Sequence, residues 1–127
     1  MMHRSRLCSI LLDCSTDTME AGVRFWQQAL GTTVHHAEDS TSPYVTLEGG
    51  AGGLQLSLQR VHDTSRIHLD IETDNVEAEV QRLEKLGARR KVSIQTWWVM
   101  EDPSGHLFCV VPEHSEVFSA QAHAWEA

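Results

Sequence analysis

The chain has 127 residues, and its apolar and charged fractions of 41% and 22% are ordinary for a soluble globular protein. These values exclude a disordered, collagenous or membrane-spanning chain, and the length predicts one domain that can bury a core without disulfides. Ten basic residues against eighteen acidic ones give a net charge of −8. Because nucleic acids and anionic membranes bind through basic surfaces, we expect neither as a partner.

Cysteine usage favours a reducing compartment. The chain has three cysteines, and Cys8 and Cys14 fall in one predicted strand. Their separation along that strand, about 20 Å, is too long for a disulfide. The apolar stretch from Leu7 to Leu12 stops at Asp13, and no small-residue cleavage site follows it. We therefore expect a mature cytoplasmic protein.

An internal repeat with an offset of 57 residues organises the chain. The stretch SILLDCSTDTMEAGV from Ser9 aligns without gaps with RIHLDIETDNVEAEV from Arg66, and eight of the fifteen positions are identical. Two copies of this length predict a pair of pseudo-symmetric modules rather than a solenoid.

Each repeat predicts a strand followed by a helix. The motifs Asp17-x-x-Glu20 and Asp74-x-x-Glu77 are typical of helix N-termini, and we expect the aspartates to be the N-caps. Gly31 and Gly87 are expected to end the helices in the left-handed conformation. Three shorter strands are predicted after each helix, at residues 33–36, 43–48 and 54–60 in the first copy and 88–93, 96–101 and 107–111 in the second.

The predicted fold class is α+β. Two βαβββ modules, at about residues 7–61 and 65–112, form a curved mixed sheet around a concave cavity, with the helices on the outside. All of residues 1–127 are expected to form one domain. The tail, residues 113–127, is expected either to form a short helix that closes over the cavity or docks on a second subunit, or to be a frayed terminus.

Four groups of residues carry a resemblance to a known superfamily. They are, in order, Phe25-Trp26…Leu30-Gly31, Arg66-Ile67-His68-Leu69-Asp70, Leu86-Gly87-Ala88 and Asp102-Pro103-Ser104-Gly105…Phe108. The sequence from about Leu7 to Pro112 resembles the vicinal oxygen chelate superfamily, which holds glyoxalase I, bleomycin-resistance proteins and ring-cleaving dioxygenases. It is most similar to small glyoxalase-like bacterial proteins, and the resemblance implies a homodimer that binds a small molecule.

The resemblance also implies a divalent-metal site on the concave face. Its ligands are a His or Gln on the first strand, a Glu on the fourth, a His on the fifth and a Glu on the eighth. His68 matches the fifth-strand histidine. The other positions map to Leu11 (or Ser9, if the register slips by two), to Gln59 and to Cys109.

Only one of the four implied ligands is therefore retained unchanged. Because charged ligands supply most of the affinity for a hard cation, we expect no metal in this site. The alternative is a weakly held divalent metal, such as Zn, Ni, Mn or Fe, on His68 and Gln59. No catalytic residue is assigned.

Other residues are candidates for the wall of the cavity. Asp70 and its repeat mate Asp13 could form an acid–base pair, but a structural role at the strands is favoured. Trp97 and Trp98 are adjacent in one strand, so one of them should pack under the helix and the other should face a ligand. Tyr44 is a further candidate. Cys109 is expected to be an inert buried thiol.

Three functions remain open from the sequence. The favoured one is a metal-independent protein that binds a small molecule in the cavity. The second is a metal-dependent lyase or isomerase of the glyoxalase type, in which the metal polarises a carbonyl. The third is an accessory module that only dimerises.

Overall fold

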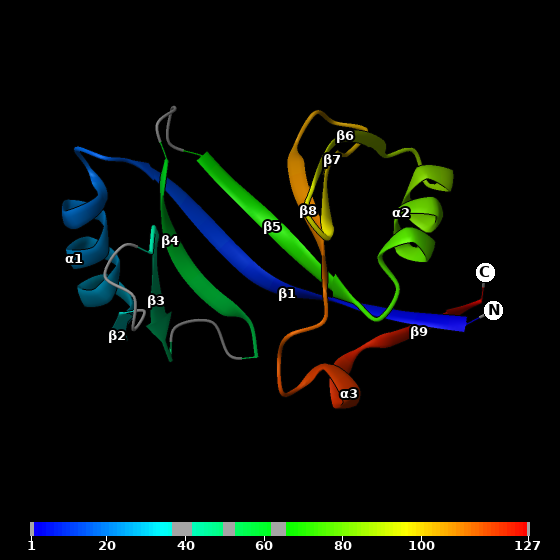
Figure 1. The fold of residues 1–127 in the computed structure, drawn as a ribbon. Coiled ribbons are helices and arrows are strands. Elements are labelled where there is room, and N and C mark those ends of the chain that lie inside the picture. The colour runs from blue at the N-terminus through cyan, green and yellow to red at the C-terminus, as the bar shows by residue number, and fades with distance from the viewer. Residues whose placement is uncertain (1, 37–41, 50–52, 62–65, 127) are drawn as a thin grey trace. The chain divides into compact units, whose positions relative to one another are not determined.

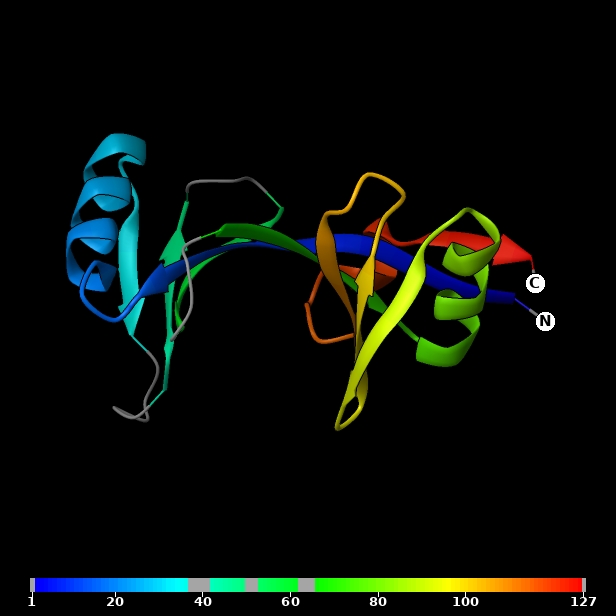
Figure 2. The same cartoon turned by 90° about the horizontal axis from the view of Figure 1, so that it is seen from above.

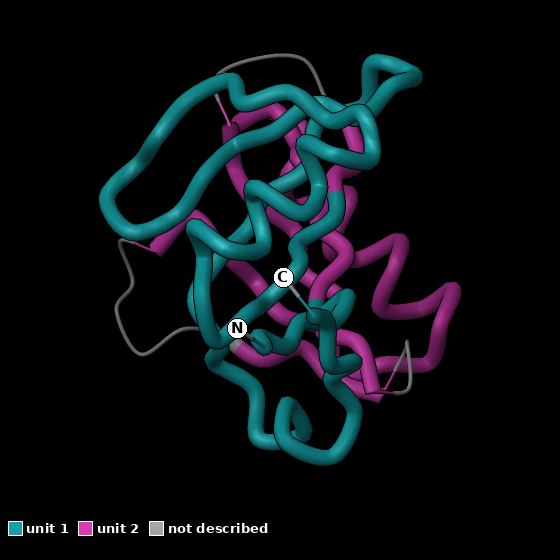
Figure 3. Tube along the Cα trace, turned by 90° about the vertical axis from the view of Figure 1, so that its right-hand side faces the viewer, with its two compact units in different colours: residues 1–8, 69–127 teal, residues 9–68 magenta. Residues whose placement is uncertain are grey.

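The computed structural model describes residues 2–36, 42–49, 53–61 and 66–126, and Figure 1 shows their fold as a ribbon. The helices and strands, in chain order, are β1 (Met2–Ser15), α1 (Met19–Leu30), β2 (Thr33–His36), β3 (Tyr44–Glu48), β4 (Gln55–Val61), β5 (Arg66–Thr73), α2 (Val76–Lys85), β6 (Arg89–Ile94), β7 (Trp97–Glu101), β8 (Leu107–Pro112), α3 (Phe118–Gln121) and β9 (His123–Glu126). The chain divides into two compact units, residues 9–68 and residues 1–8 with 69–127 (Figure 3).

The unit of residues 9–68 holds four strands in the order β2-β3-β4-β1 and the helix α1. β1 runs parallel to β4, and the other neighbours are antiparallel. Alternation along the strands gives the sheet one apolar face, which packs against α1. The buried residues of this core are Met19, Leu47, Leu56 and Leu58, and the partly buried ones around them include Ile10, Leu12, Val23 and Trp26.

The unit of residues 1–8 and 69–127 repeats this arrangement. Its strands follow the order β5-β8-β7-β6, with β5 parallel to β8 and the other neighbours antiparallel. The helix α2 lies beside β6 (Figure 2). Its core is built on Val80, Met100 and Val110. The prediction of two βαβββ modules in an α+β fold is therefore confirmed, while the predicted link at residues 62–65 lies outside the described residues.

The predicted helix caps are wrong by one residue. α1 has Thr18 at its N-cap position, and α2 has Asn75, whose side chain accepts a hydrogen bond from the backbone N–H of Ala78 at 3.0 Å. The carboxylate of Asp74 is instead used by β1, because it accepts the backbone N–H of Arg4 at 2.8 Å. An aspartate engaged by a neighbouring strand is not available to cap its own helix.

The helix ends agree with the prediction. Gly31 follows α1 with a φ of 66°, and Gly87 follows α2 with a φ of 112°. Glycine adopts these positive φ values without the steric cost that a Cβ atom adds.

The tail packs onto its own unit instead of fraying. α3 is the predicted short helix, and the strand β9 after it pairs antiparallel with Met2–Ser5 of β1. Phe118 is 3% exposed, and the guanidinium of Arg4 lies 5.1 Å from the centre of its ring. The strand β9 was not predicted, because four residues are too few to show a strand period.

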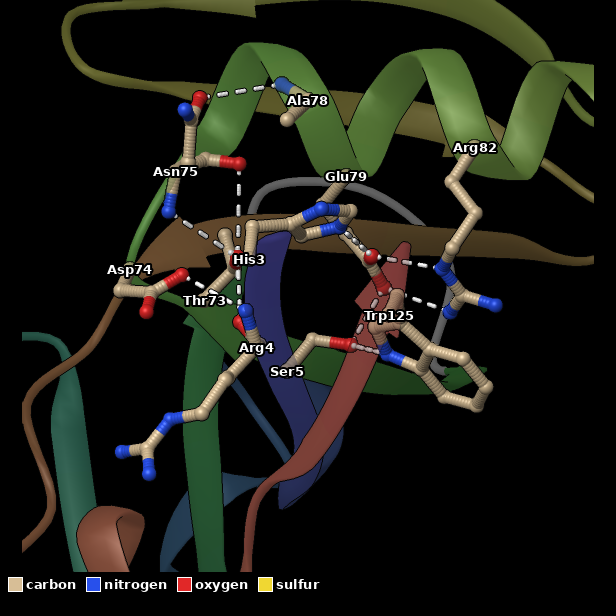
Figure 4. A network of polar contacts seen from close by, with 10 residues as sticks. All are labelled: His3, Arg4, Ser5, Thr73, Asp74, Asn75, Ala78, Glu79, Arg82 and Trp125. Atoms are coloured by element: carbon tan, nitrogen blue, oxygen red, sulfur yellow. Dashed lines mark hydrogen bonds and ion pairs between the residues drawn. The ribbon is translucent and has the colours of Figure 1, made fainter. Parts of the chain in front are cut away.

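A buried carboxylate of α2 holds the first residues of β1 in place. Glu79 is fully buried, and it accepts hydrogen bonds from His3, from Ser5 and from Nε and Nη2 of Arg82 (Figure 4). The indole of Trp125 in β9 donates to the same Ser5 hydroxyl at 2.9 Å. Burial raises the pKa of Glu79, but these donors lower it more, so the group stays ionised.

A second buried carboxylate fixes the start of the tail. One oxygen of Glu72 accepts the backbone N–H groups of His114 and Ser115, and the other accepts Arg6 and the Ser115 hydroxyl. Burial raises the pKa of Glu72, but these hydrogen bonds outweigh it and lower the pKa to about 2. The strand β5 is therefore tied to the tail by an ionised carboxylate that no solvent reaches.

We predict that Phe118→Ala destabilises the protein by about 3 kcal/mol, because it leaves a cavity under the tail. Phe25→Ala is the matched control: Phe25 is 61% exposed, and its loss should cost about 0.5 kcal/mol or less. Chemical denaturation of both variants measures this difference. Equal effects would contradict the packing of the tail.

We predict that Glu72 makes stability depend on pH. Because its folded pKa of about 2 lies below its ordinary value of 4.5, its contribution is complete above pH 4.5 and is lost as the pH falls towards 2. The full difference corresponds to about 3 kcal/mol. The free energy of unfolding, measured between pH 3 and 6, should have a smaller slope in Glu72→Gln than in the wild type. An unchanged slope would contradict the assignment.

Candidate functional site

The sheet face turned away from α1 carries a concentration of polar side chains. Asp13, Gln59 and Tyr44 are register partners on three adjacent strands, so they lie in one row across this face. The Gln59 amide donates to the Tyr44 hydroxyl at 3.2 Å. The next row holds Leu11, Ser57 and Thr46, with the two hydroxyls 3.1 Å apart.

The centre of this face is a carboxylate–imidazole pair. Asp13 is 4% exposed, and its Oδ2 lies 3.0 Å from Nδ1 of His68 and 3.5 Å from Nε of Arg66. With Nδ1–H donating to the carboxylate, the imidazole is held in one tautomer and one orientation, and Nε2 becomes the basic nitrogen. Such a histidine can accept a proton, accept a hydrogen bond or bind a metal.

Asp13 also offers an acceptor that its own unit does not use. Its Oδ1 is buried and has no hydrogen-bond partner among the residues that the structure describes. A buried acceptor without a donor costs free energy, which a ligand with an N–H or O–H group would recover. Asp13 was expected to have a structural role. The sign of a functional role in the sequence is its position two residues after Leu11, the repeat mate of His68.

In the other unit, Asp70 and Cys109 are register partners on β5 and β8, and both are partly buried. The structure also separates the two tryptophans. Trp98 packs against the core under α2, with the guanidinium of Arg90 5.0 Å from its ring centre. Trp97 is therefore the one on the face turned away from α2.

The two positions implied by the resemblance occupy equivalent places. Gln59 pairs with Asp13, and Cys109 pairs with Asp70, the repeat mate of Asp13. Gln59 lies on the fourth strand and Cys109 on the eighth, and neither is a carboxylate. Leu11 is 6% exposed and offers no ligand atom for a metal.

Comparison with known proteins identifies the family. The glyoxalase-like domain family matches residues 9–111. The chain belongs to this family. This family assignment agrees with the glyoxalase-like resemblance described for the sequence.

Solved structures share its fold. Methylmalonyl-CoA epimerase from Mycobacterium tuberculosis is 14% identical with a TM-score of 0.61, over 91% of each chain. A glyoxalase/bleomycin resistance protein/dioxygenase superfamily member from Vibrio splendidus is 17% identical with a TM-score of 0.57, over 84% of this chain and 96% of that one. A trihydroxybiphenyl dioxygenase from Sphingomonas wittichii is 14% identical with a TM-score of 0.58, over 87% of this chain and 42% of that one.

These identities show the fold and do not assign a reaction. No curated protein matches the sequence. In the described part of the glyoxalase-like chain, no helix is both long and apolar enough to cross a membrane.

We predict that Asp13→Asn changes the tautomer of His68. An asparagine amide can donate to Nδ1, which would move the ring proton to Nε2. Nitrogen NMR shifts of the imidazole measure the change, and the exposed His106 is the internal reference. The same His68 shifts in both proteins would mean that Asp13 does not set the tautomer.

Proposed function

We propose that this glyoxalase-like protein binds a small molecule in the concave cavity of the superfamily fold without a complete metal site. The observation that carries the proposal is the buried Asp13 Oδ1, which has no donor among the described residues, on a face built from Gln59, Tyr44 and His68. Ligand pockets typically combine apolar walls with a few polar groups that fix the ligand's orientation.

The side chains indicate the chemistry of the ligand. Asp13 is an acceptor, so the ligand should present a hydroxyl, amide or amine group to it. Tyr44 is 44% exposed, and its ring offers a flat surface for an aromatic or planar part of the ligand. Considered by itself, the unit of residues 1–8 and 69–127 offers further candidates for ligand contacts in Trp97, Asp70 and Cys109, while the core packing of Trp98 argues against that role.

The donor set argues against a strong metal site at the superfamily position. Of the implied ligands only His68 is present, and the Gln59 amide is hydrogen-bonded to Tyr44. Neutral donors alone hold divalent cations weakly.

We further propose that the protein is a cytoplasmic homodimer. Sedimentation at several concentrations would test the oligomeric state.

A metal-dependent lyase or isomerase is the second candidate. The pair of Asp13 and His68 favours it, because histidines that bind metals commonly donate their other nitrogen to a carboxylate. In that case His68 and Gln59 would hold the metal, which would supply Lewis-acid polarisation of a carbonyl.

The test is thermal unfolding of metal-stripped protein with planar drugs and metabolites, and separately with Ni, Co, Zn, Mn and Fe(II). A ligand at a hundred times its dissociation constant adds about 2.7 kcal/mol, which raises the melting temperature by several degrees. We expect an organic ligand to give this shift in the wild type and not in Asp13→Asn, while Asp17→Asn, an exposed matched control, keeps it.

Two outcomes would overturn the proposal. A metal-induced shift that disappears in His68→Ala would favour the second candidate. A ligand-induced shift that is unchanged in both Asp13→Asn and Tyr44→Ala would place the ligand away from this face.

A further inference from the structure

We propose a second ligand site, in which Cys8, Glu72 and His114 bind a divalent cation such as Zn²⁺. One candidate ligand atom from each side chain lies within 4.8 Å of the other two. The three come from β1, β5 and the tail, all within the unit of residues 1–8 and 69–127. Thiolate, imidazole and carboxylate are the ligands that zinc takes in proteins.

The sulfur and nitrogen are already at the distance that zinc requires. Cys8 Sγ lies 3.6 Å from His114 Nε2. A tetrahedral zinc with ordinary Zn–S and Zn–N bonds separates these two ligands by about 3.6 Å. Oε1 of Glu72 lies 3.9 Å from the same nitrogen, so a small shift of the imidazole brings the third ligand into range, and water takes the fourth position.

The charges at the site also suit a divalent cation. Glu72 is fully buried and ionised, and a bound Cys8 thiolate adds a second negative charge. The guanidinium of Arg6 contacts the other oxygen of Glu72, so one of these charges is offset. A net negative charge therefore remains on the side that faces His114.

The site is accessible from solvent through His114. Cys8 is 2% exposed and Glu72 is fully buried, but the His114 side chain is 45% exposed. The imidazole can therefore swing out and return with the cation. The Glu72 hydrogen bonds to the backbone N–H groups of His114 and Ser115 hold the chain in place during that movement.

This site uses none of the residues proposed to bind the small molecule. His114 lies beyond residues 9–111, the part of the chain that matches the family. A cation held here would join the tail to the strands β1 and β5. The cation would stabilise the packing of the tail, because linking residues that are far apart in sequence removes the most conformational entropy from the unfolded chain.

Cobalt is the probe for the thiolate, because Co²⁺ bound to sulfur gives a charge-transfer absorption in the near ultraviolet. We expect metal-stripped protein to develop this band with one equivalent of Co²⁺ and to lose it when Zn²⁺ is added. Cys8→Ser should abolish the band, while the matched controls Cys14→Ser and Cys109→Ser should keep it. In Cys8→Ser the hydroxyl can still donate to the Asp70 carbonyl, as the thiol does at 3.4 Å, so the fold should survive.

Zn²⁺ affinity and tail protection give a second measurement. Competition with a chromophoric chelator should show about tenfold or more weaker Zn²⁺ binding in His114→Ala than in the wild type. Zn²⁺ should also slow proteolysis of the tail in the wild type and in His68→Ala, but not in Cys8→Ser.

The outcomes separate this site from the proposed function. Absence of a cobalt band, or a band that disappears in Cys109→Ser and persists in Cys8→Ser, would overturn the inference. Absence of the band leaves the binding of an organic ligand at Asp13 untouched, because that binding is tested by Asp13→Asn. A band that depends on Cys109 would instead favour the metal-dependent second candidate.

Discussion

The alternation of side chains along the strands is the constraint on which the rest of the structure depends. On β1 and β4, one set of alternate residues is apolar and packs under α1, and the other set is mostly polar. A one-residue slip between these strands would exchange the two faces. The same alternation therefore builds the core and decides which residues are available to a ligand.

The repeat made most of this architecture predictable. Because its two copies share a strand and a helix start, and a glycine follows each helix, both βαβββ modules and most strand boundaries could be placed from residue patterns alone. Pairings between residues far apart in sequence could not be placed in this way. The position of Asp74 in the sequence is typical of a helix N-cap. Its carboxylate instead accepts a hydrogen bond from the backbone N–H of Arg4, in the distant strand β1. Likewise, the pair of Asp13 and His68 depends on contacts that no local spacing encodes.

Where the superfamily resemblance implies metal-binding carboxylates, this chain has Gln59 and Cys109, yet it buries carboxylates elsewhere. Glu72 and Glu79 are fully buried and surrounded by donors from the first strand and the tail. A buried carboxylate that loses its partners is costly, so these two residues specify which segments must pack together. The negative charges of Glu72 and Glu79 therefore help to hold together the unit of residues 1–8 and 69–127.

The division of the chain between its units has a consequence for biosynthesis. Residues 9–68 form one unit from continuous sequence, so their contacts become possible as soon as that stretch has left the ribosome. The other unit needs Met2–Ser5 beside His123–Glu126. One edge of Met2–Ser5 therefore stays unpaired until His123–Glu126 have been translated. We expect this protein to fold in two stages, with the unit of residues 1–8 and 69–127 forming second. The exposed edge of β1 is the segment that a chaperone would shield in the meantime.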